Sequence, residues 1–202
     1  QKERKEEEQR LLFSYKQVYL TSKGLINENK IRGACGNKIF MSNRQFGAII
    51  SRAAKQYELQ PELIAAVIHQ ESKGNPFAIR FEQGFLNRYL KNKTRKTLPG
   101  FVPAEGHCSF HTEIFSRATS WGLMQLMGET AREHGLEATF LSELCEPEAN
   151  IFMGAKILRS LINRHLGDVK RGLLAYNGGS NLSYPNEVLS HIERGRVAYL
   201  LF

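Results

Sequence analysis

Apolar positions recur at helical spacing along most of the chain, and no run alternates between apolar and polar residues for long enough to predict a strand. Between residues 46 and 57 the apolar side chains fall three or four positions apart, which predicts a helix with one buried face. Ser42 and Gln45 have the spacing of a capping box at its start, and the helix must end before Pro61. The predicted buried face consists of Phe46, Ile49, Ile50, Ala53 and Tyr57.

The next helix begins at Pro61, whose missing amide suits a first turn, and it carries an acid on its apolar side. Ile64, Val67 and Ile68 share one face of this helix. Glu71 follows at the i+7 position of the same face. Burial and the negative end of the helix dipole both disfavour a charge there, so we expect a raised pKa for Glu71, as a general acid requires near neutral pH. The alternative is that Glu71 merely ends the helix, with its carboxylate in water.

Two further helices are predicted in the second half of the chain. One follows Pro147, and the other starts after Asp168, whose carboxylate can cap it. Two glycines end the second helix, which places Tyr176 and Asn177 at its C-terminal end. The apolar stripes are Ile151, Ala155, Leu158, Leu161, Ile162 and His165 in the first helix, and Val169, Leu173 and Tyr176 in the second. Prolines and glycines between residues 97 and 116 predict a long loop or a small hairpin.

These elements predict a mainly α fold: one helical domain over residues 42–202 with the long loop or small hairpin as an insertion, preceded by a charged arm and lead-in segment over residues 1–41. The chain has 202 residues, 42% of them hydrophobic, which is enough for a substantial core. The first ten residues contain four basic, four acidic and no apolar side chains, so we interpret them as a solvated helix or a disordered arm and not as a signal peptide. No run approaches the roughly 18 apolar residues of a membrane span. The chain starts without Met, so we expect that a longer precursor was trimmed, and the export route stays open.

Three short motifs follow one another along the chain: Glu-Ser at 71–72 with Gly-Asn-Pro at 74–76, Gly-Leu-Met-Gln at 122–125, and Ala-Tyr-Asn at 175–177. Each motif is weak alone, but the three occur in this order by chance only rarely. Together they resemble the soluble lytic transglycosylases (SLT domain) of bacterial peptidoglycan metabolism, the goose-lysozyme-like glycoside hydrolase family 23. The resemblance covers roughly residues 42 to 190 and implies a lysozyme-like helical fold.

The sequence departs from the family pattern in two places. Gly128 stands where many members have Pro, which predicts a looser start for the following helix. The segment between the first two motifs, residues 80–118, is longer than in the shortest members. Inserted arms of this kind resemble those of transglycosylases carried by phages and prophages.

The resemblance implies cleavage of the β-1,4 bond between N-acetylmuramic acid and N-acetylglucosamine. Glu71 would protonate the leaving oxygen and then, as a base, accept the proton of the muramyl 6-hydroxyl, so that 1,6-anhydromuramic acid forms. The substrate's N-acetyl group would stabilise the positive charge, and the positioned hydroxyl would replace water. Tyr176 would hydrogen-bond Glu71, and Asn177 would line the cleft. The residues expected to contact the glycan are Ser120, Gly122, Met124 and Gln125.

Several of these residues also have a purely structural interpretation. Tyr176 could be an ordinary core aromatic, Met124 a gap filler and Gly122 a turn residue. Trp121, the one Trp of the chain, could pack in the core or stack on a sugar, and the sequence leaves both open.

Two alternative functions fit the same fold. The first is a hydrolytic goose-type lysozyme, or muramidase, in which a second carboxylate positions water; Glu82, Glu105 and Glu113 are its candidates. The second is a catalytically silent cell-wall-binding module within a cell-envelope or phage assembly. Glu71 argues against this second alternative, because pure binding does not require a desolvated acid.

The net charge of +8 favours anionic partners. Peptidoglycan glycan strands carry stem-peptide carboxylates, so we expect peptidoglycan as the substrate and the cell envelope, periplasmic or extracytoplasmic, as the place of action. Five basic residues lie between Arg88 and Lys96, with Tyr89 among them, a combination that also occurs in nucleic-acid sites. Since no helix-turn-helix or RNA-binding motif accompanies it, we expect no nucleic-acid partner.

Cysteine and histidine residues add little to this prediction. Cys35, Cys108 and Cys145 are odd in number, so at most one internal disulfide can form, and the compartment cannot be inferred. His107, Cys108 and His111 lack the spacing of a recognised zinc site. We therefore expect neither a metal nor a cofactor.

Overall fold

Helices dominate the computed structural model, which describes residues 43–98 and 108–201. In chain order, the helices are α3 (Asn43–Gln56), α4 (Pro61–Ser72), α5 (Gln83–Phe85), the π-helical turn η1 (Leu86–Leu90), α6 (Phe110–Arg117), α7 (Gly128–Glu133), the 3-10 helix η2 (Leu141–Cys145), α8 (Pro147–Arg164), α9 (Val169–Tyr176), α10 (Tyr184–Glu193) and α11 (Ala198–Leu201); the strands are β1 (Ile79–Phe81), β2 (Thr119–Trp121) and β3 (Leu126–Met127). The mainly α, lysozyme-like fold class predicted from the sequence is confirmed. Within the described residues, no helix is both long and apolar enough to cross a membrane.

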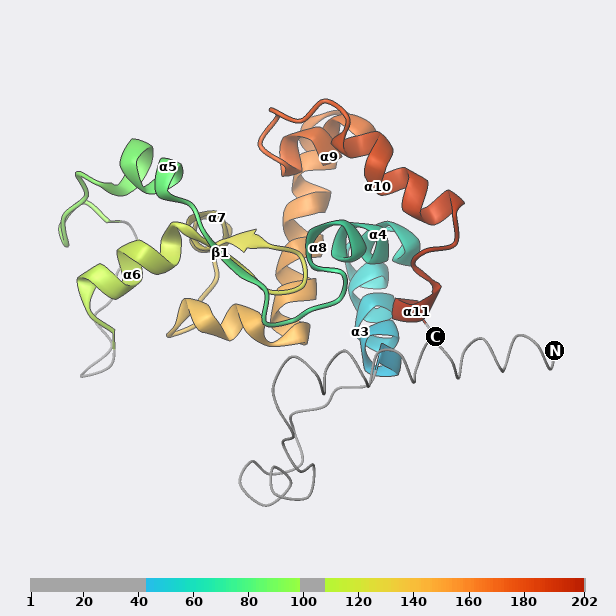
Figure 1. The fold of residues 1–202 in the computed structure, drawn as a ribbon, viewed down its shortest axis with the longest axis horizontal. Helices are drawn as coiled ribbons and strands as arrows, with labels where there is room; N and C mark the ends of the chain where they lie inside the picture. The colour runs from blue at the N-terminus through green and yellow to red at the C-terminus, as the bar shows by residue number, and fades with distance from the viewer. Residues whose placement is uncertain (1–42, 99–107, 202) are drawn as a thin grey trace, which may run out of the picture. The chain divides into compact units, whose positions relative to one another are not determined.

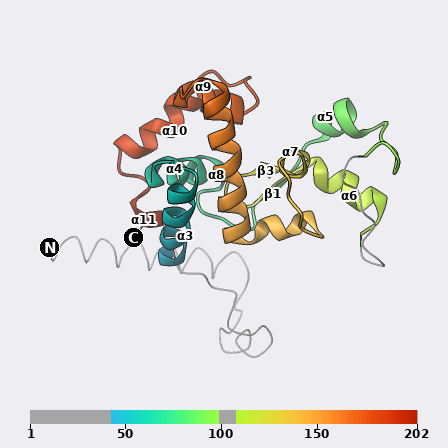
Figure 2. The same cartoon turned by 180° about the vertical axis from the view of Figure 1, so that it is seen from behind.

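Helix α4 lies at the centre of the helical part of the fold, where α3, α10 and α11 contact it (Figures 1 and 2). Every side chain from residue 63 to residue 68 is buried, although the sequence predicted a single apolar face. A helix that is apolar on all sides is a core helix, and the small side chains of Ala65 and Ala66 let its neighbours approach closely. Glu71 therefore stands at the end of a core helix.

Helix α3 buries most of its predicted apolar face. The buried residues are Phe46, Ile49, Ile50 and Ala53. Tyr57 lies beyond the helix end and packs edge-to-face on Phe152 of α8, with ring centroids 6.4 Å apart. The predicted capping box of Ser42 and Gln45 lies outside the described side chains.

Helices α8 and α9 pack closely because of a glycine. A Cβ on Gly172 would lie 2.5 Å from Cγ1 of Ile162, so no larger residue fits there. Asp168 caps α9 as predicted, since its Oδ1 accepts from the Arg171 amide at 3.0 Å, and the helix ends at Tyr176. The predicted stripe of α8 is buried at Ile151, Ala155, Leu158 and Ile162 and half-buried at Leu161 and His165.

Three short antiparallel strands form a sheet in the order β1-β2-β3, with β1 at an edge. Arg80 pairs with Ser120, and Ser120 pairs with Met127. The strands have three, three and two residues, so their alternation is too short to show in the sequence.

The segment predicted as a long loop or small hairpin, residues 97–116, contains helix α6 instead. Ser109 caps this helix, because its Oγ accepts from the Thr112 amide at 3.0 Å. The helix also buries apolar side chains in a small cluster within the insertion, which consists of Leu90, Leu98, Ile114 and Ala118. The prolines and glycines behind the loop prediction all fall in residues 99–107, outside the described residues.

Four charged side chains join α6 to α7 in a cluster with little exposure to solvent. Oε1 of Glu113 accepts from Nε of Arg117 at 2.8 Å and from Nε of Arg132 at 3.0 Å. Nη1 of Arg117 also donates to Oε2 of Glu129 at 2.9 Å. The side chains of Arg117 and Glu113 are 1% and 4% exposed, so each charge depends on its partners in this cluster.

Gly128 permits a close contact between α6 and α7. A Cβ at this position would lie 2.4 Å from the carbonyl oxygen of Ser116. The start of α7 is therefore tightly packed, which corrects the prediction of a looser boundary. A proline carries a Cβ, so the packing of α6 excludes it here.

Candidate active site

Glu71 lies in the last turn of α4, just before Lys73 ends the helix in the left-handed conformation at φ 54°. Its side chain is partly buried. Burial raises the pKa of Glu71, and a hydrogen bond from Tyr184 and the positive charge of Arg80 oppose this rise without cancelling it. The direction of the pKa shift agrees with the sequence prediction, and the carboxyl group keeps its proton to a higher pH than an ordinary Glu.

A tyrosine outside the three motifs holds Glu71. The hydroxyl of Tyr184 donates to Oε1 of Glu71 at 2.5 Å. Tyr184 is the buried first residue of α10, and Pro185 suits the first turn of that helix. Burial and the charge of Glu71 raise the pKa of Tyr184, so its hydroxyl stays protonated and remains a donor. Because Oε1 accepts this bond, Oε2 is the oxygen that is available to carry a proton.

Tyr176 does not make the hydrogen bond to Glu71 that the sequence predicted. Its hydroxyl donates to the carbonyl oxygen of Met124 at 2.8 Å, and a phenol has only one proton to give. Burial and, second, the charge of Glu71 raise the pKa of Tyr176, so the two residues lie close together. Tyr176 thus fixes the loop beside the acid, and Tyr184 holds the acid itself.

The sequence contains a signal for Tyr184. Tyr184 directly precedes Pro185, a residue that suits the first turn of a helix. Tyr184, Val188 and His191 are spaced i, i+4 and i+7, so periodicity alone places them on one face of that helix. That this face packs against α4 is a tertiary contact, which periodicity does not give.

The loop at 122–125 is shaped by a glycine and a buried asparagine. Gly122 has φ +69°, and a Cβ there would lie 2.3 Å from the carbonyl oxygen of Leu144. Oδ1 of Asn150 accepts from the amide of Met124 at 2.8 Å. Nδ2 of Asn150 donates to the carbonyl oxygens of Trp121 and Leu144 at 2.9 and 2.8 Å. Asn150 was not among the predicted residues, and its only signal is a polar position on an otherwise apolar helix face.

The side chain of Met124 faces the core. It is fully buried, and a Cβ on Gly154 of α8 would lie 2.3 Å from its sulfur. The predicted contact between the Met124 side chain and a sugar is therefore corrected. Met124 contributes its backbone to the site, and its side chain fills the gap that Gly154 leaves.

Gln125 and Ser120 hold the backbone around this loop. Gln125 has φ +48° and donates through Nε2 to the carbonyl oxygens of Ala78 and Gly122, each at 2.9 Å. Ser120 is buried, and its Oγ donates to the sulfur of Met127 at 3.2 Å. The contacts of Ser120, Gly122 and Gln125 with a glycan stay predictions.

Bonds from side chains to backbone bring the three motifs together. Oγ of Ser72 donates to the carbonyl oxygen of Leu123 at 2.7 Å, which joins the first motif to the second. The bond from Tyr176 to the same loop joins the third motif. Glu71 thus lies beside this loop and the end of α9. Asn177, the residue that ends α9, is half-buried, and its place in a cleft stays a prediction.

Two of the three candidate second carboxylates have other partners. Glu113 belongs to the buried cluster with two arginines. Oε1 of Glu82 lies 2.5 Å from Nε of the exposed Arg80. Glu105 lies outside the described residues.

A polar network lies between α4, α10 and α11. Nε2 of Gln70 donates to Oε2 of Glu187 at 3.0 Å, and Oε1 of Gln70 lies 2.7 Å from Nε2 of His191. The ring centroids of His191 and His69 are 4.5 Å apart. Nδ1 of His69 lies 3.1 Å from the hydroxyl of Tyr199. Through Glu187 and His191, the network fixes both the first and the last turn of α10 against the end of α4, and with them the tyrosine that begins α10.

The described residues contain no group of three or more His, Cys, Asp or Glu side chains that could hold a metal. Cys108 and Cys145 are free thiols, and burial raises the pKa of each. Cys35 and His107 lie outside the described residues.

Comparison with known proteins places the chain in a family. The sequence model of the transglycosylase SLT domain matches residues 48–184, more than half of the chain. The chain therefore belongs to the SLT transglycosylase family, which confirms the resemblance that its motifs indicate. A protein of Enterobacteria phage PRD1 described as a transglycosylase is 31% identical over 156 residues, which cover 73% of this chain and 43% of the phage protein. The chain thus spans less than half the length of that relative. No solved structure matches the chain.

Proposed function

We propose that this domain is a peptidoglycan lytic transglycosylase that cleaves the β-1,4 bond between N-acetylmuramic acid and N-acetylglucosamine with formation of 1,6-anhydromuramic acid. The observation that carries this proposal is the partly buried Glu71. Its pKa is raised, and Tyr184 binds its Oε1, which leaves Oε2 for proton transfer. Membership of the SLT transglycosylase family supports the same class of reaction.

In the first step, Glu71 gives the proton on Oε2 to the glycosidic oxygen as the bond from that oxygen to the muramyl C1 breaks. Tyr184 keeps its bond to Oε1. Hydrogen bonds to ionised acceptors are stronger than bonds to neutral ones, so this bond strengthens as the carboxylate forms. Tyr184 therefore lowers the free-energy cost of the transfer without taking the proton itself.

In the second step, the carboxylate of Glu71 accepts the proton of the muramyl 6-hydroxyl while the oxygen of that hydroxyl bonds to C1. The 1,6-anhydro ring closes, and the acid is protonated again for the next cycle. The substrate's N-acetyl group stabilises the positive charge between the two steps. One carboxyl group thus serves as both acid and base.

The partners of Glu82 and Glu113 favour this reaction over hydrolysis through either of these two carboxylates. A lysozyme of the inverting type needs a second free carboxylate to activate water. Glu113 is bonded to two arginines in the interior, and Glu82 pairs with Arg80. The raised pKa of Glu71 also speaks against a silent wall-binding module.

The substrate and place of action follow from the same proposal. We infer that the domain acts on peptidoglycan glycan strands in the cell envelope, outside the cytoplasm. The net charge of +8 supports attraction to stem-peptide carboxylates. A cell-envelope or phage assembly partner is a further part of this proposal, supported by the phage relative.

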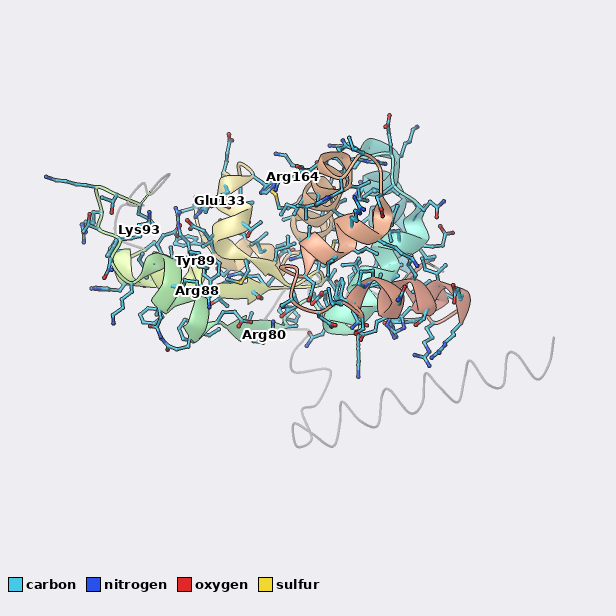
Figure 3. The ribbon with its side chains drawn as sticks, turned by 90° about the horizontal axis from the view of Figure 1, so that it is seen from above. Arg80, Arg88, Tyr89, Lys93, Glu133 and Arg164 are labelled. Carbon is cyan, nitrogen blue, oxygen red and sulfur yellow. The ribbon has the colours of Figure 1, made fainter. Side chains whose placement is uncertain are left out.

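Replacement of the acid tests the proposal. Glu71→Gln keeps the shape of the side chain but cannot transfer a proton, so we expect solubilisation of purified sacculi to slow at least about 100-fold. The matched control is Glu133→Gln, an exposed Glu on α7 (Figure 3), which should keep the wild-type rate. Equal rates for the wild type and a folded Glu71→Gln protein would refute the role of Glu71. A comparable loss in Glu82→Gln would favour the hydrolytic alternative.

A further inference from the structure

Large apolar side chains are exposed mainly in one region of the described chain. Five of the seven exposed large apolar residues lie in β1, just before it, or in the insertion that follows it, so they are not scattered as single surface residues usually are. These five are Phe77, Ile79, Phe81, Tyr89 and Phe115. The other two, Leu166 and Leu182, flank α9.

Two of these rings form a continuous surface between β1 and α6. Ile79 and Phe81 stand on the same face of β1, because side chains alternate along a strand. The ring centroids of Phe81 and Phe115 are 5.5 Å apart, and the rings are tilted by 47°. The two residues are 41% and 50% exposed, so each ring lies against the protein and leaves about half of its surface to solvent. The surface thus presents two neighbouring aromatic rings, each about half exposed.

Strand β1 connects this surface to the active site. Arg80 lies between Ile79 and Phe81, so its side chain is on the other face of β1, and its positive charge lowers the pKa of Glu71. Gln125 binds the carbonyl oxygen of Ala78, next to the start of the same strand. Strand β1 therefore joins the neighbourhood of the acid to the insertion, and a polymer bound at Glu71 would pass this strand to reach the rings.

The insertion next to these rings is basic. Five basic side chains lie between residues 88 and 96, and the nearest acid in the sequence, Glu82, is paired with Arg80. Figure 3 shows Arg80, Arg88 and Lys93 spread from β1 along the insertion, with Tyr89 beside Arg88. The guanidinium carbon of Arg88 lies 5.8 Å from the centroid of that tyrosine ring. The charge complements a polymer that carries carboxylates.

We propose that Phe81 and Phe115 form an accessory platform on which sugar rings of the peptidoglycan glycan strand stack, while the basic side chains of residues 88–96 bind stem-peptide carboxylates. The inference rests on the proposed function, because the acid must act on the same strand. Two neighbouring, half-exposed aromatic rings fit sugar rings, which offer an apolar C–H surface.

The test is binding to the polymer in a background that cannot degrade it. Glu71→Gln protein is sedimented with purified sacculi, and with glycan strands from which an amidase has removed the stem peptides. Adding Phe81→Ala and Phe115→Ala should weaken binding to both ligands at least about fivefold, the loss expected from two aromatic contacts. Adding Leu166→Ala, a change at an equally apolar residue that is 98% exposed, should leave binding unchanged. Melting temperatures check that each protein is folded, and Phe115→Ala alone, which keeps a good helix former in α6, should weaken binding about twofold or more.

Three results would overturn the platform. If the folded platform variants bind both ligands as tightly as the Glu71→Gln protein does, the platform proposal is wrong. A loss that occurs with sacculi but not with stripped strands would assign the rings to the stem peptides, and a loss that occurs only with phosphatidylglycerol vesicles would assign them to a membrane. Failure of the proposed function itself is separate, because the wild type would then release no 1,6-anhydro-muropeptides from sacculi.

Discussion

At the scale of single residues, the proton affinity of Glu71 is set by two opposing influences. Burial disfavours the carboxylate, and the hydroxyl of Tyr184 stabilises it. The bond from Tyr184 thus limits the rise in pKa that burial imposes on this acid.

Tyr184→Phe removes this bond and leaves the burial. The pKa of Glu71 should rise further, and the alkaline limb of the pH–rate profile, where the protonated acid is lost, should move to higher pH. We expect the maximal rate to fall about tenfold, as for loss of one hydrogen bond to a charged group. Rates of sacculus solubilisation across pH measure both effects.

Tyr176→Phe serves as the comparison for this prediction. It removes the bond to the carbonyl oxygen of Met124 but none to Glu71, so the alkaline limb should stay in place even where the rate falls. If the alkaline limb moves in Tyr176→Phe and not in Tyr184→Phe, then Tyr176, and not Tyr184, is the residue that sets the pKa of Glu71.

At the scale of elements, α6 and α7 depend on a charge cluster in the interior. Glu113→Gln leaves Arg117 and Arg132 without the carboxylate that they share, so we expect a loss of about 3–5 kcal/mol in the free energy of unfolding. The exposed pair of Arg80 and Glu82 is the control, and Glu82→Gln should cost less than about 1 kcal/mol. Urea denaturation measures both, and similar losses for the two variants would contradict the account.

Helix α10 is held against α4 by groups that titrate. Burial is the largest cause of the lowered pKa of His69 and of His191, so the unfolded chain binds more protons than the folded one and stability falls as pH drops below the ordinary histidine value of 6.5. His191→Gln should therefore make the melting temperature depend less on pH between about pH 7 and pH 5. The charged neighbours that also shift the pKa of these two histidines are Lys73, Glu187, Arg194 and Arg196. If the melting temperature of the variant depends on pH as strongly as that of the wild type, groups other than His191 cause the pH dependence.

At the scale of the whole molecule, local features could be predicted from the sequence and contacts between distant segments could not. The helix faces and the acid at the end of α4 leave local signatures in periodicity and motifs. Tyr184 and Glu71 are 113 positions apart, and Asn150 and Met124 are 26 apart. The residues next to each partner in the sequence therefore do not predict these two contacts. The motif identified Tyr176 as important, but only the packing shows which group its hydroxyl binds.

Helix α6 was missed for a different physical reason. The prolines and glycines of residues 99–107 led to the prediction of a loop for the whole segment 97–116. The same segment also contains a helix start that is capped by Ser109. Glu113 and Arg117 of that helix then meet α7 in a buried cluster, whereas the same charges in a sequence suggest a solvated surface. A charge becomes recognisable as buried only when its partners are known.

The most direct test of the central claim is mass spectrometry of the muropeptides that the wild-type protein and Glu71→Gln release from purified peptidoglycan. The account predicts 1,6-anhydro-muropeptides, about 18 Da lighter than the hydrolysed forms, from the wild type and none from the variant. Muropeptides with reducing ends from the wild type would contradict it and identify a hydrolytic lysozyme.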